Sequence, residues 1–379
     1  MQEICYDIRN IKIKQMSLLQ KKVFDLFPSS FGLDLSDLSI KAVWLDREGK
    51  QDFIASFGSV PLPPGSVMDG EIINPSAVEA AIKSLLQKAG PRKIKSKKVI
   101  CSLPETKAFL RIISLPIMEH EETKEAIKWE IEANIPLTLD QVYYDWQVID
   151  KTFTQEKGKM NVLVVAVARN VVDQFQGILE AAGLEPLGLE TESIAQARSL
   201  LPEKKDKSTT LIVDIGDRRT SFLIAIGSMP CFTSSVPLSS QMITDAISKT
   251  MHLSFEEAES LKIKHGLGSV AIKSPVMMAA QPILESIATE IEKSMDFYLT
   301  NLRYSEAIDS IIFCGGGSNM NGLLPYMSRR LGRPVEAGNP WVNVHLGKRI
   351  PIIERNHSVQ YSTAIGLALR GLDEYEDFA

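Results

Sequence analysis

The residue with the clearest chemical potential is Asp214, an acid at the end of an apolar strand. The stretch Leu211–Ala225 is an apolar, β-branched run that ends at Asp214, turns at Gly216 and resumes as a second apolar strand at Ser221. This pattern predicts a buried hairpin with polar groups at its tip. A carboxylate is costly to bury unless a cation or hydrogen bonds compensate it, so the position suggests a cation site. Taken alone, an ordinary Asp-x-Gly hairpin turn explains the stretch equally well.

A second copy of this pattern lies near the start of the chain, at Phe31–Val43. Three pairs of residues align between the copies at a constant separation of 180 residues (214 minus 34): Asp34 with Asp214, Ser36 with Gly216, and Asp37 with Asp217. Two copies half a chain apart predict duplicated domains that face each other across a cleft. Backbone N–H groups at such tips can bind phosphate, and the two acids could hold Mg²⁺ through water.

Three consecutive glycines, Gly315–Gly317, follow the predicted strand Ser310–Cys314. Because they lack side chains, they allow close backbone approach by a flat or anionic ligand, ahead of a helix that we expect Ser318 or Asn319 to cap. The spacing does not complete a Rossmann Gly-x-Gly-x-x-Gly pattern, and the chain contains no Gly-x-x-x-x-Gly-Lys-Ser/Thr loop. The two standard nucleotide-binding motifs therefore find little support.

The composition argues against several classes of protein. The chain has 379 residues, 44% of them hydrophobic, a net charge of −5 and a pI of about 5.7, which fits two globular domains and argues against nucleic-acid binding by bulk charge. No window of eighteen apolar residues occurs, and the first ten residues lack the apolar core of a signal peptide, so we expect a cytoplasmic location. The cysteines are scattered without a Cys-x-x-Cys pair, which predicts reduced thiols: Cys5, Cys101, Cys231 and Cys314.

The elements that must position these residues alternate between strands and helices, which predicts an α/β fold. We expect a tail over 1–30, a first domain over 31–207 with an inserted subdomain at about 97–169, and a second domain over 208–379 with a helical subdomain at about 238–309. Helical spacing predicts a long helix over Pro282–Asn301 and a closing helix with small residues over Tyr361–Leu372. In the tail, Ser17–Phe27 is either a short amphipathic segment at an anionic membrane or a frayed terminus, and the true start could be Met1 or Met16.

Two acid-tipped hairpins, a small-residue helix after each half and a triple-glycine turn together resemble the superfamily of actin, sugar kinases and heat-shock ATPases. The resemblance covers essentially everything from residue 30 to the end. It implies an actin-like (ribonuclease H-like) fold of duplicated α/β domains with an FtsA-type inserted subdomain, and it implies ATP and Mg²⁺ as cofactors. In that superfamily the two hairpins are phosphate loops and the glycine turn is the adenosine loop.

The resemblance also implies a role for each matching residue. Asp34 and Asp214 would bind Mg²⁺ through water, and Glu192 would orient the attacking water. The nucleotide would contact the two hairpin tips and the glycine turn, that is, Leu35, Ser36, Asp37, Gly216, Asp217, Arg218, Gly315, Gly316, Gly317 and Ser318. Glu259 and Lys262, one helical turn apart, match a pair that holds ribose or purine, although such a pair on an exposed helix is commonly a surface ion pair.

Within the superfamily, the inserted block resembles the PilM family of type IV pilus assembly proteins, an FtsA-like branch. The resemblance rests on three runs: Lys124–Leu137, Val142–Ile149 and Pro61–Gly70. It implies a cytoplasmic protein that is peripheral to the inner membrane, holds the N-terminal cytoplasmic tail of PilN in a groove near the inserted subdomain, and meets other platform proteins of the pilus. It implies neither a nucleic-acid partner nor a transmembrane segment.

One departure from the superfamily pattern bears on catalysis. Many superfamily ATPases have a small residue two positions after the second-loop glycine, where this chain has Arg218, followed by Arg219. A guanidinium there could add to phosphate binding, face solvent or crowd the nucleotide. The sequence therefore favours a nucleotide-binding scaffold that is at most a slow ATPase, and it leaves an active ATPase, a small-molecule kinase and a filament former as alternatives.

Overall fold

The computed structural model of the protein describes residues 30–135, 137–149, 158–203, 208–268, 274–300, 307–346 and 352–376. The predicted tail lies outside these residues apart from Ser30, and so do its Ser17–Phe27 segment and Cys5. The chain divides into two compact units. The first comprises Met1–Ala195, Val344–Arg349 and Thr363–Ala379, and the second comprises Gln196–Asn343 and Ile350–Ser362.

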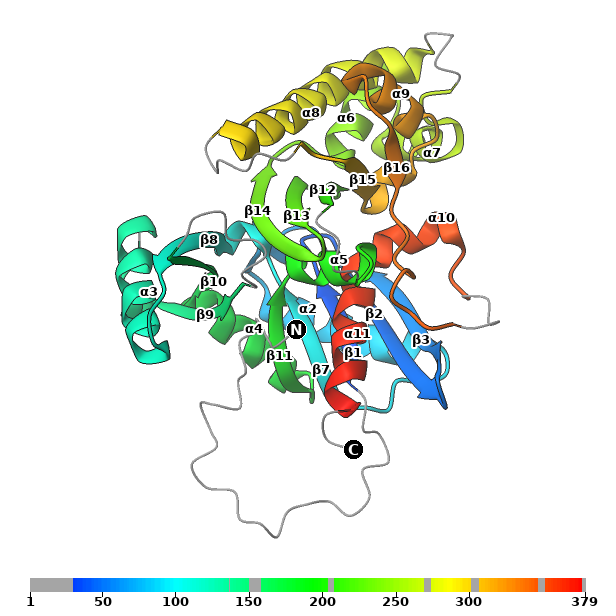
Figure 1. Ribbon diagram of the computed structural model, residues 1–379. Coiled ribbons are helices and arrows are strands. Elements are labelled where there is room, and N and C mark those ends of the chain that lie inside the picture. Colours follow the sequence, from blue (N-terminus) through cyan, green and yellow to red (C-terminus); the bar gives the residue numbers. More distant parts are fainter. Residues whose placement is uncertain are drawn as a thin grey trace. The chain divides into compact units, whose positions relative to one another are not determined.

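A six-stranded sheet organises the first unit, with the strand order β11-β7-β1-β2-β3-β6 (Figure 1). Its strands are β1 (Phe31–Leu35), β2 (Ser39–Glu48), β3 (Gln51–Pro61), β6 (Gly90–Pro91), β7 (Lys98–Leu103) and β11 (Glu185–Thr191), and a small pair, β4 (Val67–Met68) and β5 (Glu71–Ile72), stands apart. The unit also holds the helices α2 (Pro75–Lys88) and α4 (Arg169–Ala181), the first turn of α5 (Glu192–Leu200) and nearly all of α11 (Ser362–Glu376). Phe31, Leu33 and Phe175 lie in its apolar core.

Small residues allow the backbone of α11 to lie close to the backbones of β1 and α5. The sequence predicted such close packing for the closing helix. A Cβ atom added to Gly366 would lie 1.8 Å from the backbone oxygen of Ala195, and one added to Gly32 would lie 2.2 Å from that of Ala364. No side chain fits in these gaps, because real Cβ atoms do not approach other atoms so closely. The glycines thus place α11 directly against β1 and α5.

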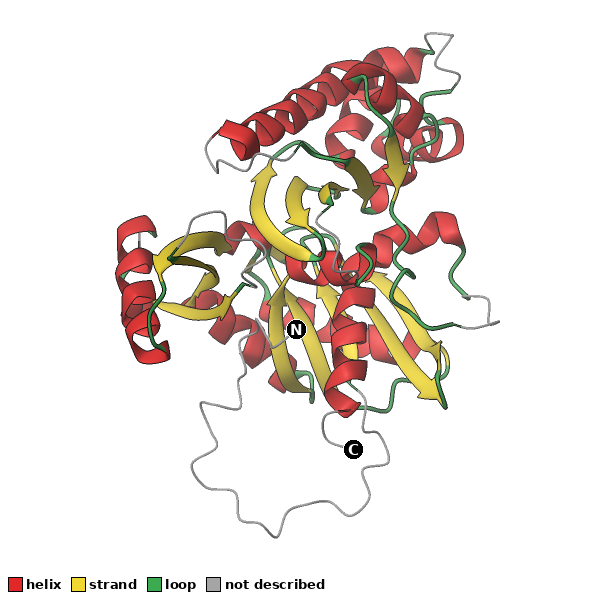
Figure 2. Cartoon of the chain, viewed as in Figure 1, coloured by secondary structure: helices red, strands yellow, loops and turns green. Residues whose placement is uncertain are grey.

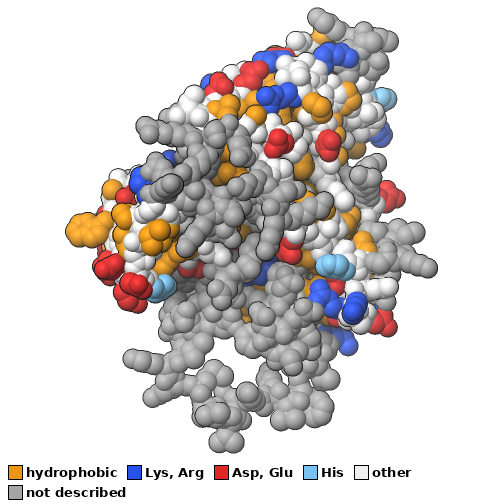
Figure 3. Space-filling model, in the orientation of Figure 1, with side chains coloured by type: hydrophobic (Ala, Val, Ile, Leu, Met, Phe, Trp, Pro, Cys, Tyr) orange, Lys and Arg blue, Asp and Glu red, His pale blue; other side chains and the backbone are white. Residues whose placement is uncertain are grey.

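The inserted module is a three-stranded antiparallel sheet with one helix. Strand β10 (Lys159–Ala168) pairs with β8 (Ala108–Pro116) on one side and with β9 (Val142–Val148) on the other. Helix α3 (His120–Asn134) packs Thr123, Ile127 and Ile131 against this sheet, after a capping box between Glu119 and Glu122. Its outer side carries Trp129, which is 73% exposed, and Figure 3 shows hydrophobic and acidic side chains gathered over the module.

The second unit is built on a sheet with the order β16-β15-β12-β13-β14. Its strands are β12 (Thr209–Ile215), β13 (Thr220–Ile226), β14 (Met229–Val236), β15 (Ser310–Cys314) and β16 (Val335–Ala337), and its helices are α6 (Ser240–Met251), α7 (Phe255–His265), α8 (Pro275–Thr300), α9 (Leu323–Leu331) and α10 (Arg355–Ser358). The capping box that starts α7, Ser254 with Glu257, agrees with its sequence pattern.

The two units repeat one motif, which confirms the predicted duplication and the actin-like α/β fold. Figure 2 shows that both helices and strands build the protein. In the first unit β1 pairs antiparallel with β2 and parallel with β7, and in the second β12 pairs antiparallel with β13 and parallel with β15. Asp34 lies opposite Lys41, and Asp214 lies opposite Ser221. Each acid therefore occupies the same place in its hairpin.

Three features differ from the sequence expectations. Helix α8 begins at Pro275 and carries Pro282 inside it, because Val276 and Ala280 are buried upstream and that packing outweighs the backbone hydrogen bond that the proline lacks. Strand β7 pairs with β1 and β11, so the inserted module's strands begin at Ala108 rather than near residue 97. The compact units part after Ala195 rather than at 207, and most of α11 belongs to the first unit.

Candidate functional site

In the first unit, the structure surrounds Asp34 with two polar partners. The Lys41 ammonium lies 3.3 Å from Asp34 Oδ2, and the Ser102 hydroxyl donates to Asp34 Oδ1 at 3.3 Å. The same hydroxyl oxygen accepts a hydrogen bond from the Leu35 backbone N–H at 2.9 Å. Sequence reasoning missed both partners, although pairing the predicted hairpin would have placed Lys41 directly across from Asp34.

Polar groups at the tip of the first hairpin form hydrogen bonds within the first unit. The Ser36 N–H donates to the Ser39 carbonyl at 3.0 Å, and Asp37 Oδ1 accepts a hydrogen bond from the Gly70 N–H at 3.1 Å. The Asp37 side chain thus anchors the turn at Gly70, which has a positive φ of 78°. The amides of Leu35 and Ser36, which we predicted to face phosphate, have partners within the unit.

In the second unit, one carboxylate oxygen of Asp214 accepts a hydrogen bond and the other lies beside the glycine turn. The buried Gln196 side chain on α5 donates from Nε2 to Asp214 Oδ2. The Gly315 backbone lies beside Oδ1, since a Cβ added there would stand 2.0 Å from that oxygen. The structure therefore brings Asp214 and the glycine turn together and adds Gln196, which lies 18 residues before Asp214 and carried no sequence signal.

The second hairpin tip is bound to the start of α6. The Gly216 N–H donates to the Arg219 carbonyl at 2.8 Å, and the Ser240 N–H donates to the Gly216 carbonyl at 3.0 Å. The Gln241 N–H donates to the Asp217 carbonyl at 3.2 Å. Arg219 Nε reaches the Ser235 hydroxyl on β14 at 3.1 Å, whereas Arg218 is exposed at the tip. Of the two tip arginines, Arg219 is thus held against the sheet.

Two glycines of the triple-glycine turn, Gly315 and Gly317, pack closely against β12. Gly315 has a φ of 81°, and a Cβ added to Gly317 would lie 2.5 Å from Ile215 Cγ2. A Cβ at Gly316 would meet nothing within 4 Å. The close approach that we predicted for a ligand is therefore made by β12 at Gly315 and Gly317, and Gly316 is the position with open space.

The helix after this turn starts later than predicted. Residues Gly316–Asn319 form a single 3₁₀ turn in which the Ser318 hydroxyl donates to the Gly315 carbonyl at 2.7 Å. Helix α9 begins at Leu323 and has Gly322, rather than Ser318 or Asn319, at its N-cap. Because of this turn, the Ser318 hydroxyl hydrogen-bonds within the glycine turn and does not cap α9.

Glu259 and Lys262 lie on α7, but the lysine is not on an exposed helix surface. Lys262 is 6% exposed, and its ammonium donates to the Ser240 hydroxyl and the Thr244 hydroxyl, each at 2.8 Å, and to the Ser240 carbonyl at 3.2 Å. It also pairs with Glu259 at 2.8 Å, and Thr244 donates to the same carboxylate oxygen. A buried ammonium needs such partners, and these bonds tie α7 to α6.

A buried cysteine stands beside each acid. Burial raises the pKa of the Cys101 thiol, and the negative charge of Asp34 raises it further. Burial and then the charge of Asp214 raise the pKa of the Cys314 thiol in the same way. These cysteines therefore stay protonated at neutral pH and pack as small apolar groups, which agrees with the sequence prediction of reduced thiols.

Glu192 starts α5 and is half-buried, and it belongs to the first unit with Asp34. The other predicted site residues of the second unit are Asp214, Gly216, Asp217, Arg218, Glu259, Lys262 and Gly315–Ser318. Among the described residues, no group of three His, Cys, Asp or Glu side chains could hold a metal ion directly. Single carboxylates with polar neighbours suit Mg²⁺, because this ion keeps most of its water shell.

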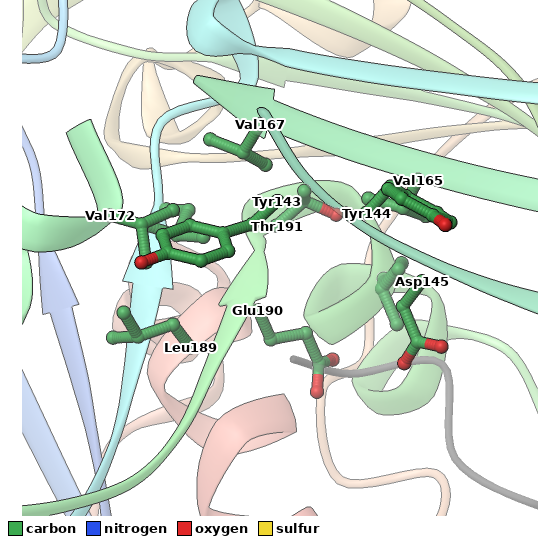
Figure 4. A pocket seen from close by; sticks show the side chains of 11 residues that line it. Tyr143, Tyr144, Asp145, Val165, Val167, Val172, Leu189, Glu190 and Thr191 are labelled. Atoms are coloured by element: carbon green, nitrogen blue, oxygen red, sulfur yellow. The ribbon is translucent and has the colours of Figure 1, made fainter. Parts of the chain in front are cut away.

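A pocket in the first unit is lined in part by residues of the strands β9 and β11 (Figure 4). It is open to solvent and has a volume of about 360 Å³, part of which is open solvent. It is lined by Leu103, Tyr143, Tyr144, Asp145, Val165, Val167, Val172, Leu189, Glu190, Thr191 and Ile194. Among the described strands, β9 and β11 each end the order of their sheet, and both contribute residues that line the pocket. The Tyr143 hydroxyl donates to Asp173 at 3.1 Å, and the Arg169 guanidinium lies 4.0 Å from the Tyr143 ring centroid.

One of the residues that line the pocket, Glu190, belongs to a buried ion pair. Glu190 lies 3.2 Å from the Arg370 guanidinium of α11, and their side chains are 0% and 6% exposed. Sequence reasoning did not identify the pocket residues. Its nearest signal was the Val142–Ile149 run, which contributes Tyr143, Tyr144 and Asp145.

Comparisons with known proteins agree with this architecture. A family model described as "Type IV pilus assembly protein PilM" matches residues 32–372. A solved structure titled "PilM-PilN type IV pilus biogenesis complex" is 27% identical, with a TM-score of 0.76 over 91% of this chain and 98% of that one. The cell division protein FtsA of Neisseria meningitidis serogroup B is 23% identical over 272 residues, 65% of this chain.

The match to that FtsA protein spans 64% of its length, so it covers less than two thirds of the relative. MreB 5 of Spiroplasma citri, solved bound to AMPPNP, aligns with a TM-score of 0.55 at 13% identity over 92% of this chain and 97% of that one, which shows a shared fold. No helix in the described part of the chain is long and apolar enough to cross a membrane.

Proposed function

Because the chain belongs to the family of the type IV pilus assembly protein PilM, we propose that it is a nucleotide-binding scaffold of the pilus assembly platform. The observation that carries the proposal is the family match over residues 32–372, which includes both hairpins, the inserted module and the glycine turn. The scaffold would work in the cytoplasm at the inner face of the inner membrane, as a peripheral protein.

We propose ATP with Mg²⁺ as its ligand. Asp34 and Asp214 would hold the ion through water, Lys41 would offer its ammonium to phosphate oxygens, and the open space at Gly316 would admit the adenosine. When bound, Mg²⁺ would neutralise part of the phosphate charge. The nucleotide would act as a conformational ligand, hydrolysed slowly at most.

The nucleotide proposal has a direct test in the purified protein. We expect mass spectrometry after denaturation to show ATP or ADP at near one per chain, and we expect Asp214→Asn to lose most of it. Asp140→Asn, at an exposed acid in the inserted module, serves as the control and should retain the nucleotide. A wild-type protein that carries no nucleotide and binds no Mg-ATP in titration would contradict the proposal.

We further propose that the pocket between β9 and β11 holds the cytoplasmic N-terminal tail of a PilN-type partner. The solved relative is titled as a complex of PilM with PilN. The pocket is lined by residues of two strands, β9 and β11, which suits an extended segment that can add to a strand. The two strand edges offer backbone groups to such a segment, and the valines and leucines offer an apolar floor.

The pocket proposal predicts how a tail peptide responds to two aromatic truncations. Tyr144→Ala should weaken binding of a synthetic PilN tail peptide about tenfold, because aromatic anchors carry much of the energy at such interfaces. Trp129→Ala, in the same module but outside the pocket, should leave the affinity unchanged. Calorimetric titration with and without ATP should give different affinities if the two ligands are coupled. Equal weakening by both substitutions would contradict the pocket assignment.

A further inference from the structure

We propose that the loop over residues 92–97, the basic loop, is a contact surface for an anionic lipid membrane. The loop connects β6 to β7 and contains no acid, and it carries four exposed cations: Arg92, Lys93, Lys95 and Lys97. This assignment rests on the proposed location at the inner membrane. It gives that location a surface of this chain that lies outside both the candidate nucleotide site and the pocket.

The packing of the basic loop turns its lysines outward. Exposure alternates along the loop, with the three lysines exposed and the residues between them turned inward. Ile94 packs against the apolar core of the first unit, and Ser96 is 4% exposed and accepts a hydrogen bond from the Lys98 N–H at 3.2 Å. The inward residues therefore anchor the loop while the ammonium groups of the lysines face solvent.

The basic loop crosses the sheet of the first unit. It begins at β6, which pairs with β3, and it ends at β7, which pairs with β1 and β11. In the strand order β11-β7-β1-β2-β3-β6 the loop therefore passes β3, β2 and β1 (Figure 1). The Arg92 N–H donates to the Ala55 carbonyl on β3 at 3.1 Å, and the Arg92 guanidinium lies 3.8 Å from Asp46 near the end of β2. The loop thus spreads its cations over several strands.

The N-terminal tail joins the fold beside this loop. Strand β1 is parallel to β7, and its first residue, Phe31, lies opposite Val99, two residues after Lys97. The sequence before β1 contains the predicted amphipathic segment Ser17–Phe27 with its two adjacent lysines. The chain therefore leads from one basic segment into the fold at the place where the other ends.

The chemistry of the two basic segments favours lipid over nucleic acid. The basic loop contains no aromatic side chain that could stack on a base, and the net charge of −5 opposes binding to a long polyanion. An anionic bilayer attracts a small cluster of lysines locally, since salt screens charges beyond about 10 Å. The apolar residues of the amphipathic segment can enter the headgroup region, which a nucleic acid does not offer.

Acidic residues at the same end of the sheet set the strength of this contact. Asp46 offsets the charge of Arg92, and Glu185 lies opposite Lys98 at the start of β11. Helix α11 also ends nearby, since a Cβ added to Gly371 would lie 2.1 Å from the Ser30 hydroxyl oxygen, and four acids follow in the sequence: Asp373, Glu374, Glu376 and Asp377. We therefore expect a weak, salt-dependent contact that acts together with the partner's tail.

The membrane contact and the pocket can be used at the same time. Strand β7 runs six residues from Lys98, next to the basic loop, to Leu103, which lines the pocket. This length corresponds to roughly 17 Å of strand. A PilN-type tail that leaves the bilayer could cover that distance with about six extended residues.

Sedimentation of the full-length protein with lipid vesicles tests the proposal, without a partner peptide. The vesicles consist of phosphatidylcholine with or without phosphatidylglycerol. We expect the protein to bind only the vesicles that contain phosphatidylglycerol, and we expect added salt to weaken this binding. Lys93→Gln with Lys97→Gln should lower the vesicle affinity at least tenfold, because each lysine near an anionic surface raises the affinity roughly fivefold.

Two control pairs separate the basic loop from net charge. Lys93→Arg with Lys97→Arg keeps both charges and should bind vesicles like the wild type. Lys249→Gln with Lys264→Gln removes the same charge from exposed lysines of α6 and α7 and should also keep the affinity. If this second pair weakens binding as much as the loop pair does, the attraction belongs to the net charge and the proposal is refuted.

The remaining outcomes decide the partner and the segment. If Lys21→Gln with Lys22→Gln abolishes vesicle binding while the loop pair leaves it unchanged, the tail alone is the anchor and the loop assignment fails. If transfer RNA binds more tightly than the vesicles and the loop pair weakens it, the basic loop is a nucleic-acid contact instead. A wild type that ignores anionic vesicles but binds Mg-ATP and the PilN tail peptide would refute this inference and leave the proposed function standing.

Discussion

Replacing Gly315 by alanine is expected to abolish nucleotide retention and to destabilise the protein. The new Cβ would lie 2.0 Å from Asp214 Oδ1 and 2.6 Å from the Ile215 carbonyl oxygen, at a backbone φ of 81°. With a φ of 81° and a ψ of 166°, Gly315 lies in a region essentially restricted to glycine, which costs alanine about 1–3 kcal/mol, and overpacking costs a further 1–3 kcal/mol or so. The displaced β12 end would also move Asp214 away from Gln196. Urea unfolding and mass spectrometry of retained nucleotide measure the two effects.

The neighbouring glycine supplies the control for this prediction. Gly316→Ala adds the same methyl group one residue later, where nothing lies within 4 Å, so the free energy of unfolding should change by less than about 0.5 kcal/mol. If the two alanine variants proved equally stable, the close packing of the glycine turn on β12 would be wrong. A fall in nucleotide affinity without a fall in stability at Gly316 would support its assignment to the adenosine loop.

Replacing Arg370 by methionine should lower the free energy of unfolding by about 3–5 kcal/mol. The substitution removes the guanidinium that lies 3.2 Å from Glu190, whose side chain is 0% exposed. Removing one partner of a buried ion pair costs about this much, because the remaining carboxylate loses the ionic attraction that offsets its desolvation. Because Glu190 also lines the pocket, the affinity for the tail peptide should fall in the same variant.

The double variant Arg370→Met with Glu190→Gln tests this cause. It removes both charges, so most of the lost stability should return. Lys83→Met is the matched control, because Lys83 pairs with Glu79 at the surface of α2, where its side chain is 51% exposed, and such pairs contribute little. A double variant as unstable as the single one would show that the pair matters through packing at Gly188, whose added Cβ would lie 2.8 Å from Arg370.

The hairpins show what could be predicted from local pattern. Each apolar run with an acid near its end forms a strand, and Asp34 and Asp214, which are 180 residues apart, occupy the same place in two matching motifs. The start of α7 at its capping box was equally readable. These features depend on residues within a few positions of one another, so periodicity and capping rules suffice to find them.

Prediction failed where distant packing overrides local preference. Pro282 reads as a helix start, yet α8 begins at Pro275 because its upstream apolar residues are buried. Of the two sequence interpretations of Lys262, the exposed surface pair is wrong, because its buried ammonium donates three hydrogen bonds to Ser240 and Thr244 of α6 and pairs with Glu259. The sequences of α8 and α7 alone do not show which other elements pack against these helices.

The sequence by itself determined the duplicated α/β pattern, the placement of one acid at each hairpin and the family to which the chain belongs. Only the tertiary structure decided what surrounds those acids: Lys41 and Ser102 at Asp34, and Gln196 and Gly315 at Asp214. It also placed the edges of β9 and β11 beside one pocket and set Arg370 against Glu190. Strand and turn patterns arise from neighbouring residues, whereas these contacts join residues far apart in the chain and exist only once the elements have packed.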